Sequence, residues 1–376
     1  MNSVETVVGS GMRLTCSRDE LSQALGVVSR GVSARGSVQI LGGILLRAEA
    51  GLLHVAATDM EISLRTSVEA EIGEDGAVVV PGRLLVDIAR LLPESEVSLE
   101  HRLEENTLQV MCGASEYRLR TYGVEDFPRL PEVDPVGLHS VETEPLLETI
   151  GRVSRAASRD ESRPVLTGIL VRFEPGKLVM AATDSYRLSV KETPIGAVVP
   201  ELEAIVPARA LEELRRIAVG NEHVKLGVHE NQAVFGAGDV WLTTRRIDGQ
   251  FPSYKTLIPE TFEHEVTLPR GELLEVVRRT GVMAQRNSPL RLRFAEGELT
   301  ISAQTQDVGE SCESLPAPFG GEPLEIGFNP EFLRDGIESV TGESVILKLI
   351  NPLRPGLLQG VGEEFWYLIM PIRLAG

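Results

Sequence analysis

The chain alternates between two hydrophobic periods, one typical of helices and one typical of strands. Apolar stripes at helical spacing occur within residues 21–28, 146–153 and 273–277, and each follows a short strand-like stretch. Ser17 precedes the first stripe, and Glu20 follows Ser17 by three positions, which is the spacing of a capping box. Thr143 caps the second stripe, and Pro145 suits its first turn. The pattern therefore predicts a strand and then a helix at the start of three segments.

Each segment continues with a hairpin, a proline-ended strand and a second helix. The proline-ended strands lie at 78–81, 204–207 and 326–330, and the helices after them at 83–92, 209–219 and 331–340. Alternating strands follow each second helix, as at 97–100, 107–112 and 116–121 in the first segment. We therefore expect an α+β fold in which each segment packs two helices on one face of mainly antiparallel sheets.

The first two segments are copies of one unit. The stretch 41–64 returns without a gap 125 positions later, within 165–190, and both copies contain Ala-Ala-Thr-Asp. The paired positions include Gly43 with Gly168, Arg47 with Arg172, and Gly51 with Gly176. Phe-Pro closes both segments, at 127–128 and 251–252, before a proline-punctuated linker. The repeat predicts three tandem domains, at 12–133, 134–259 and 260–376, after a flexible extension at 1–11.

Composition limits what such a repeat protein does. The 376 residues are 42% apolar and 24% charged, which is the balance of a soluble globular protein. The net charge of −18 repels nucleic acid overall, so any contact with DNA must be local and weak. No apolar run approaches the roughly 18 residues of a membrane helix, and the start lacks the features of a signal peptide. We expect a cytoplasmic protein without a membrane partner.

Candidate chemistry is sparse. Cys16, Cys112 and Cys312 are odd in number and far apart, so we expect buried reduced thiols and neither a disulfide framework nor a metal site. The sequence contains no GxxxxGK[ST], HExxH, GxSxG or CxxC, and its six histidines lack metal-ligand spacing. We predict no catalytic residue, metal or cofactor. An enzyme remains a rival class, which polymerase and nuclease assays of the pure chain would test.

Arginines gather at the ends of the predicted helices. Three similar segments with helices on one face tend to curve, and a head-to-tail contact between chains then closes a ring or makes a filament. Sparse arginines on the inner wall would attract DNA without reading its sequence. A cation in the last turn of a helix also suits the helix dipole, and this alternative stays open for each arginine. The candidate DNA-facing helix residues are Arg83, Arg90, Arg152, Arg155, Arg209, Arg215, Arg278 and Arg279.

Several short motifs spread over residues 12–374 resemble the bacterial sliding clamps, the beta subunits of DNA polymerase III. They are Ile40-Leu41, Val80-Pro81, Phe127-Pro128, Leu166-Thr167-Gly168, Ala182-Thr183-Asp184 with Arg187-Leu188, residues 248–254, Gly327-Phe328-Asn329 and residues 370–374. The resemblance implies a homodimeric ring of six similar domains, in which each chain is half of the closed ring. Such a ring encircles duplex DNA and tethers the polymerase as a non-catalytic processivity factor. It also implies that Arg35 and Arg163 lie in DNA-contacting loops.

The resemblance further places a peptide-binding groove between the second and third domains. Apolar anchors of a short extended peptide would enter it, while a few polar groups fix the register. One side comprises Leu166, Thr183, Ser185, Tyr186, Arg187, Leu188, Pro252 and Leu257, and the other comprises Asn329, Phe332, Leu353, Met370, Pro371, Ile372, Arg373 and Leu374. The implied partners are the catalytic subunit of DNA polymerase III, the clamp loader, and other polymerases and repair proteins that carry clamp-binding peptides.

Two alternatives accompany this interpretation. Leu166, Leu188 and Ile372 would equally suit a hydrophobic core, and the shared Thr-Asp pairs at 58–59 and 183–184 suit hydrogen-bonded turns more than catalysis. A repeat scaffold that binds proteins and never DNA is the second function class. That scaffold predicts no segregation of the arginines onto one face.

Overall fold

The structure, a computed structural model, describes residues 11–33, 38–131, 133, 137–196, 201–229, 231–284, 288–306 and 309–374. Most of the predicted N-terminal extension, and Arg35, therefore lie outside the described residues. The chain divides into two compact units, Met1–Thr143 with Glu213–Arg246, and Glu144–Glu212 with Ile247–Gly376. Each unit thus combines one terminal domain with part of the central domain.

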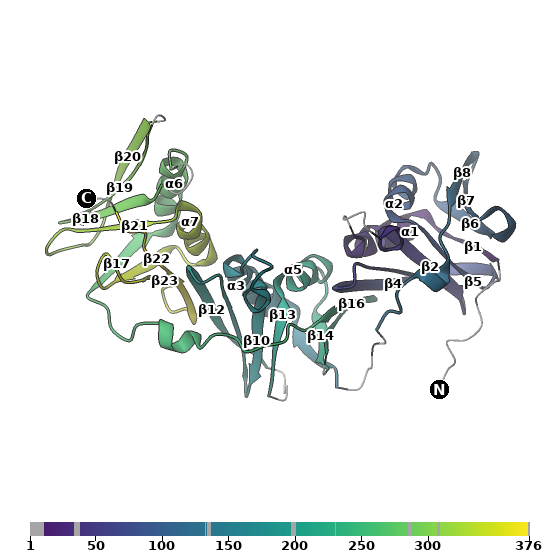
Figure 1. Cartoon of the computed structure of the whole chain (residues 1–376), viewed down its shortest axis with the longest axis horizontal. Helices are drawn as coiled ribbons and strands as arrows, with labels where there is room; N and C mark the ends of the chain where they lie inside the picture. Colours follow the sequence, from purple (N-terminus) through teal and green to yellow (C-terminus); the bar gives the residue numbers. More distant parts are fainter. Residues whose placement is uncertain are drawn as a thin grey trace. The chain divides into compact units, whose positions relative to one another are not determined.

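The first unit is organised by one sheet, which contains twelve strands among the described residues. Its strands are β1 (Met12–Ser17), β2 (Gly43–Glu49), β3 (Leu52–Thr58), β4 (Ile62–Glu74), β5 (Gly76–Pro81), β6 (Glu96–Arg102), β7 (Thr107–Cys112), β8 (Ser115–Arg120), β9 (His139–Glu142), β14 (His223–Val228), β15 (Gln232–Ala237) and β16 (Val240–Arg245). The main order is β8-β7-β6-β1-β4-β16-β15-β14-β9, with β2, β3 and β5 attached beside β4. Helices α1 (Arg18–Val28) and α2 (Gly82–Leu91) lie against each other, and α1 also packs on β4 (Figure 1).

Short 3-10 turns complete this unit: η1 (Ser29–Gly31), η2 (Gln39–Gly42), η3 (Leu103–Glu105) and η4 (Val124–Asp126). Helix α5 (Ala208–Ile217) crosses from the second unit into the first. The strand pairing between β4 and β16 is antiparallel and joins residues of the first and second predicted domains. The sheets therefore do not coincide with the domains along the sequence, because one sheet contains strands from both domains.

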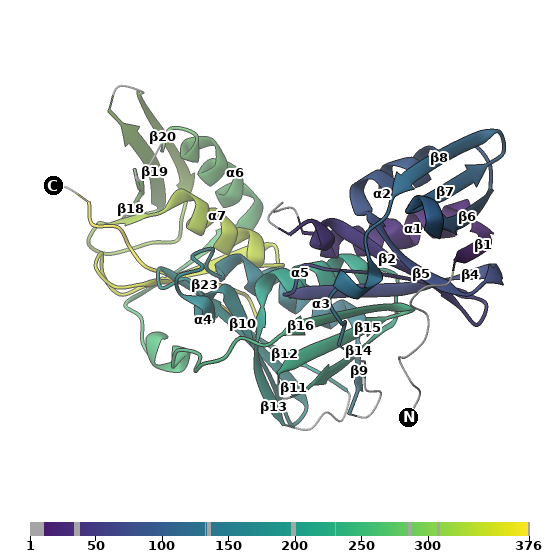
Figure 2. The same cartoon turned by 45° about the vertical axis from the view of Figure 1, so that its right-hand side comes forward.

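The second unit contains two sheets. The larger has the order β13-β10-β11-β12-β24-β23-β22-β17, and the smaller has the order β20-β19-β18-β21. The strands are β10 (Gly168–Glu174), β11 (Lys177–Thr183), β12 (Arg187–Pro194), β13 (Leu202–Pro207), β17 (His264–Pro269), β18 (Leu290–Ala295), β19 (Glu298–Thr305), β20 (Gly309–Pro316), β21 (Leu324–Phe328), β22 (Ser344–Leu349), β23 (Gly356–Gly360) and β24 (Phe365–Ile369). The helical segments are α3 (Thr143–Val153), η5 (Ser154–Ala156), α4 (Pro164–Thr167), η6 (Tyr254–Leu257), α6 (Arg270–Gly281) and α7 (Pro330–Ser339). Helices α6 and α7 lie side by side (Figure 2).

The elements reproduce the predicted α+β fold of three tandem, similar domains. Strands β10 and β11 begin and end 125 positions after β2 and β3, the hairpin strands to which they correspond. The Ser17 side chain accepts the Glu20 amide at 3.4 Å, so the predicted helix cap is confirmed. Asn329 caps α7 by accepting the amides of Glu331 and Phe332. Local sequence signals therefore set the boundaries of these helices.

The shared Thr-Asp pairs form the predicted turns. Thr58 Oγ1 donates to the Ile62 carbonyl at 3.0 Å, and Asp59 Oδ1 accepts the Ile62 amide at 2.9 Å. The second copy is equivalent, because Thr183 Oγ1 donates to the Arg187 carbonyl at 2.6 Å. Both turns place a non-glycine residue, Met60 or Ser185, in the left-handed region, with φ of 78° and 79°. These aspartates are thus structural, which agrees with the prediction.

The paired glycines Gly43 and Gly168 are required by close packing between strands. A Cβ atom on Gly168 would lie 2.4 Å from Ile205 Cγ2 and 2.8 Å from Ile247 Cδ1. We expect Gly168→Ala to destabilise the protein by about 1–3 kcal/mol, because overpacking a buried site forces neighbouring side chains to move. Urea unfolding measures the difference. Gly271→Ala is the matched control, because nothing lies within 4 Å of its Cβ position; equal effects of the two substitutions would contradict the packing explanation.

One prediction about the cysteines is wrong. Cys16 and Cys112 are buried, as expected, but Cys312 is exposed. Cys312 lies on β20, an edge strand of the smaller sheet, where alternate residues face solvent. Burial, reinforced by the nearby carboxylate of Glu20, raises the pKa of the Cys16 thiol to about 12. Cys16 therefore stays a protonated core residue at neutral pH.

Candidate functional site

The two predicted sides of the groove meet where β12 pairs with β24. Arg187 lies opposite Ile369 and Leu188 opposite Leu368, and the Met370 amide donates to the Tyr186 carbonyl at 2.8 Å. Residues from the second and third domains therefore share one sheet at this point. Leu188 and Leu368 belong to the buried core of that sheet, together with Phe251 and Tyr254 from the linker.

Arg187 connects the turn at the end of β11 to helix α7. Its guanidinium pairs with Asp184 at 3.1 Å and with Asp335 at 2.6 Å, and it also donates to the Tyr367 hydroxyl at 3.2 Å. The guanidinium lies over the Phe332 ring, 4.2 Å from its centroid. The arginine side chain is only 11% exposed. Arg187 is thus an internal cross-link of this region, with its Nε bonded to Asp184 and its Nη1 to both Asp335 and Tyr367.

The electrostatics of this cluster keep Arg187 charged. Burial by itself lowers the pKa of Arg187, but the surrounding Tyr367, Asp335 and Asp184 raise it by more, and the net shift is upward. Burial raises the pKa of the Tyr367 hydroxyl, although Arg187 opposes that shift. The hydroxyl also donates to the Phe332 carbonyl at 2.9 Å. A neutral phenol and a permanent cation therefore hold β24 and α7 together.

Several predicted groove residues are large apolar side chains that remain exposed. Tyr186 is 62% exposed, Leu257 49%, Leu353 63% and Met370 43%. Such residues, close to an otherwise charged surface, are typical of a site for a protein partner. Pro252 and Arg373 are also exposed, whereas Thr183 and Leu166 are buried.

The core alternative holds for part of the predicted set. Leu166 is 9% exposed and Leu188 only 3%, so both are packed within the domain. Ile372 is partly exposed, and its backbone pairs with Gly327 of β21. A Cβ atom on Gly327 would lie 2.6 Å from Leu374 Cδ2, so the glycine makes room for the C-terminal tail. The tail is therefore docked on the third domain along 370–374.

The candidate DNA-facing arginines differ in what surrounds them. Arg83 and Arg90 on α2 are exposed, and neither forms an ion pair with another described residue. Arg209 is exposed and Arg215 partly exposed, both on α5. Arg163, just before α4, is exposed and donates to Asp160 and to the Ser185 hydroxyl. These residues present cations at the surface of their own units.

Arg152 does not fit its predicted role. The residue is 5% exposed, pairs with Glu148 at 2.9 Å and with Glu363, and stacks on Phe365 at 4.2 Å from the ring centroid. A cation enclosed in this way has no surface for a phosphate. The helical pattern could not reveal this, because Glu363 lies 211 positions away in sequence. Arg152 is thus a structural link between α3 and the third domain.

Three further arginines are exposed but neutralised by carboxylates. Arg155 and Arg278 both pair with Glu338, at 2.5 and 2.9 Å, and Arg279 pairs with Glu313 at 2.6 Å. Burial raises the pKa of Glu338, but hydrogen bonds from Arg278 and Arg155 lower it by more, so it is held below its usual value. A phosphate would have to compete with these carboxylates for the arginines, which weakens any attraction to DNA.

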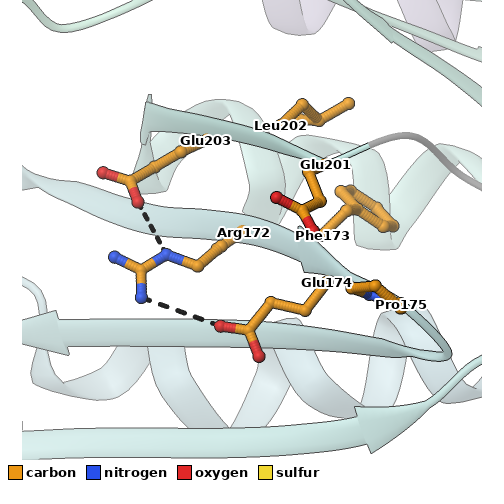
Figure 3. A pocket seen from close by; sticks show the side chains of 7 residues that line it. All are labelled: Arg172, Phe173, Glu174, Pro175, Glu201, Leu202 and Glu203. Atoms are coloured by element: carbon orange, nitrogen blue, oxygen red, sulfur yellow. Dashed lines mark hydrogen bonds and ion pairs between the residues drawn. The ribbon is translucent and has the colours of Figure 1, made fainter.

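A shallow hollow of about 530 Å³ lies beside the β10–β11 hairpin, and charged side chains form much of its lining (Figure 3). Arg172 lies between Glu203 and Glu174, with ion-pair distances of 2.6 and 3.8 Å. Surface pairs of this kind contribute about 0–1 kcal/mol. The repeated arginine at this position therefore pairs charges on the surface of a strand.

No group of three or more His, Cys, Asp or Glu side chains is placed to hold a metal ion within the described parts of the chain. None of the helices seen there is long and apolar enough to cross a membrane.

Sequence reasoning missed Asp335, Glu363 and Tyr367. A signal for Asp335 was present, because the sixth residue of each second helix is acidic: Asp87 in α2, Glu213 in α5 and Asp335 in α7. Glu213 pairs with Arg30, and Asp335 pairs with Arg155, which lies 125 positions after Arg30. Comparing α7, the second helix of the third domain, with α2 and α5, the second helices of the first two domains, would have pointed to this ion pair. Nothing local marks Tyr367 or Glu363.

Fold and site together define a repeat-built α+β protein with an exposed apolar docking region. Family models match all three domains: DNA polymerase III beta subunit, N-terminal domain, at residues 12–131, central domain at 140–253 and C-terminal domain at 255–373. The chain therefore belongs to the DNA polymerase III beta subunit family, the non-catalytic sliding clamps of bacterial DNA replication.

Individual relatives agree. The beta sliding clamp of Streptomyces coelicolor is 35% identical over 379 residues, covering 97% of this chain and all of the relative. The solved sliding clamp of Bacillus subtilis superposes with a TM-score of 0.92 at 26% identity, covering 97% of this chain and 100% of that one. The clamp of Pseudomonas aeruginosa, solved bound to griselimycin, gives a TM-score of 0.89 at 28% identity, with the same coverage.

Proposed function

We propose that two copies of this chain close head to tail into a ring that encircles duplex DNA in the cytoplasm. Membership of the sliding clamp family over nearly the whole chain is the observation that carries this proposal. Strands β8 and β20 lie at the edges of their sheets and are largely exposed. β8 carries Arg118 and Arg120, and β20 carries Glu310 and Glu313. Unpaired edges of opposite charge favour strand pairing between copies.

The arginines Arg35, Arg83, Arg90, Arg163, Arg209, Arg215, Arg278 and Arg279 would face the DNA, joined by Arg155. Contacts from a few cations to phosphates depend on salt and not on base sequence, so they permit sliding. The net charge of −18 opposes binding of DNA elsewhere on the protein. The ring would therefore hold DNA by topology and contact it only lightly.

The groove at the β12–β24 junction would receive peptides from the replicative polymerase, the clamp loader, and other polymerases and repair proteins. The exposed side chains of Tyr186, Leu257, Leu353 and Met370 support this role, because aromatic and aliphatic anchors dominate the energetics of such interfaces. One site shared by many partners would make the clamp a docking platform. A scaffold that never binds DNA is not favoured, since the relatives are named beta sliding clamps.

Topological binding separates a ring from a protein that grips DNA. After loading by a clamp loader, we expect the protein to remain on nicked circular DNA for at least about tenfold longer than on the same DNA made linear. A ring leaves linear DNA by sliding off the ends, whereas phosphate contacts would be the same on both forms. Gel filtration of the DNA complexes measures retention. Equal retention would contradict encirclement, and blocking both ends of the linear DNA should restore retention.

A further inference from the structure

The junction between β4 and β16 in the first unit is a copy of the junction between β12 and β24 in the second. The Arg245 amide donates to the Glu61 carbonyl at 3.3 Å, and the Met370 amide donates to the Tyr186 carbonyl at 2.8 Å. Each residue of the second pair lies 125 positions after its counterpart. The repeated Thr-Asp turn ends the neighbouring strand in both copies. The same local structure is therefore built twice.

The first junction also contains a hollow, of about 80 Å³. Its lining includes Thr58, Met60, Ser63, Leu130, Thr243 and Thr244. This volume holds several waters or one small aliphatic side chain, and it is far below the roughly 300–1,000 Å³ of sites for cofactors or drug-sized ligands. The hollow therefore suits one anchoring side chain of a larger partner.

At two surface positions, the first junction carries charged side chains and the second junction carries large, mainly apolar ones. Glu61 stands at the position of Tyr186, and Arg245 at the position of Met370. Arg129 and Arg245 both line the hollow and are exposed, and neither forms an ion pair with any residue for which the structure gives a position. Guanidinium groups recognise carboxylates by paired, charge-assisted hydrogen bonds. Glu61 also lines the hollow, but the two arginines outnumber this one carboxylate, so the occupant should carry carboxylates beside its apolar anchor.

Met60 forms a fixed apolar wall of the hollow. It is 50% exposed, and its backbone is held at φ 78° while its amide donates to Thr58 Oγ1 at 3.1 Å. The Ser63 hydroxyl donates to the same oxygen at 2.9 Å. Because these bonds hold the backbone of the turn, the place from which the Met60 side chain extends is set before binding, and only its rotamers have to be ordered.

We propose that the β4–β16 junction is a second docking site, which binds a short acidic peptide segment. One small aliphatic side chain enters the hollow between Met60 and Leu130, and aspartate or glutamate side chains on either side of it pair with Arg129 and Arg245. The site is distinct from the groove at the β12–β24 junction and selects a different chemistry. It requires neither DNA nor ring closure.

Photo-crosslinking of the full-length protein tests the proposal. The probe is an acetylated hexapeptide with photo-leucine between two aspartates and glycines elsewhere, and mass spectrometry locates the adducts. We expect adducts within residues 58–63 and 128–131, and about tenfold less labelling with the matching asparagine peptide, because two exposed ion pairs of up to roughly 1 kcal/mol each are lost. Labelling should also fall as salt is raised.

Matched variants separate this site from other binding. Arg245→Glu should reduce the adducts about tenfold, whereas Lys225→Glu, the same charge change on the exposed face of β14, should leave them unchanged. Met60→Asn keeps the left-handed backbone and should also reduce labelling. Leu257→Ser, which alters only the other groove, should not. Absence of adducts in these two segments, or equal labelling of Arg245→Glu and the parent, would overturn the proposal.

Discussion

Removing residues 370–376 should abolish stimulation of the polymerase while leaving the proposed dimer intact. The deleted segment carries Met370, which is 43% exposed beside Tyr186, and Ile372, whose backbone is paired with Gly327. The few dominant anchors of a peptide interface each contribute about 2 kcal/mol or more, so losing the whole segment should weaken peptide binding by at least about thirtyfold. Processive synthesis on a primed circle, with the clamp loader present, measures the effect.

A shorter deletion provides the control for this experiment. Removal of 375–376 alone leaves every predicted groove residue in place, so synthesis should match that of the parent. Gel filtration should give the same size for the parent and both truncated proteins, because the edge strands β8 and β20, through which we propose that the copies pair, are untouched. Normal stimulation by the protein with the longer deletion would show that partners do not use the β12–β24 junction. That result would contradict the proposed groove and not the proposed ring.

Replacing Arg187 by alanine should destabilise the second unit by about 3 kcal/mol. Removal of one partner from a buried ion pair leaves the other charge without compensation, and such losses are typically 3–5 kcal/mol. Asp335 and Asp184 are 17% and 13% exposed, so water would compensate them only in part. The stacking on Phe332 and the bond to Tyr367 would be lost as well.

Tryptophan fluorescence follows this unfolding locally. The chain has two tryptophans, and Trp366 lies on β24, opposite Val190 of β12. In a Trp241→Phe background, the urea transition of Trp366 should move to clearly lower concentration in Arg187→Ala. Arg172→Ala, which removes a pair on the exposed surface of a strand, should cost about 1 kcal/mol or less. Arg187→Lys should rescue little, because an ammonium cannot reproduce the planar fork; a full rescue would contradict the role given to the guanidinium.

The duplicated junctions suggest how one fold acquires two docking chemistries. Both keep the hydrogen-bonded Thr-Asp turn, the strand pairing and an ion pair from an arginine to the sixth residue of a helix. The residues that differ are those at the surface, Glu61 against Tyr186 and Arg245 against Met370. Scaffold and specificity are therefore carried by separate positions of the same repeat.

The sequence was informative wherever the signal was local or repeated. Ser17 and Glu20 gave the first helix cap, and the glycine at Gly51 and Gly176 gave both hairpins, since each has a positive φ of 80° or 76°. The Thr-Asp turns followed from side chains that bond within four residues. The core alternative for Leu188 also followed from the sequence, because apolar residues at strand spacing are typical of a buried strand, and Leu188 is buried.

Local reasoning failed where a side chain meets a partner far away in the chain. Arg152 has the position of a surface cation at the end of a helix, yet Glu363 and Phe365 enclose it. Free cysteines are usually buried, yet Cys312 is exposed because its strand lies at a sheet edge. In both cases burial depends on the neighbouring strand or domain, which periodicity does not specify.

By itself, the sequence determined the threefold α+β repeat, its turns, the cap of its first helix, and the family to which the chain is similar. Those features depend on bonds and spacings within a few residues, or on comparison of one segment with another. Only the tertiary structure decided which arginines are exposed and which are enclosed, and that the β4–β16 junction contains a charged hollow. It also decided that Gly336 must be a glycine, because a Cβ there would lie 2.6 Å from the Tyr367 ring. Each of these depends on side chains that are distant in sequence, and their contacts exist only once the strands have paired.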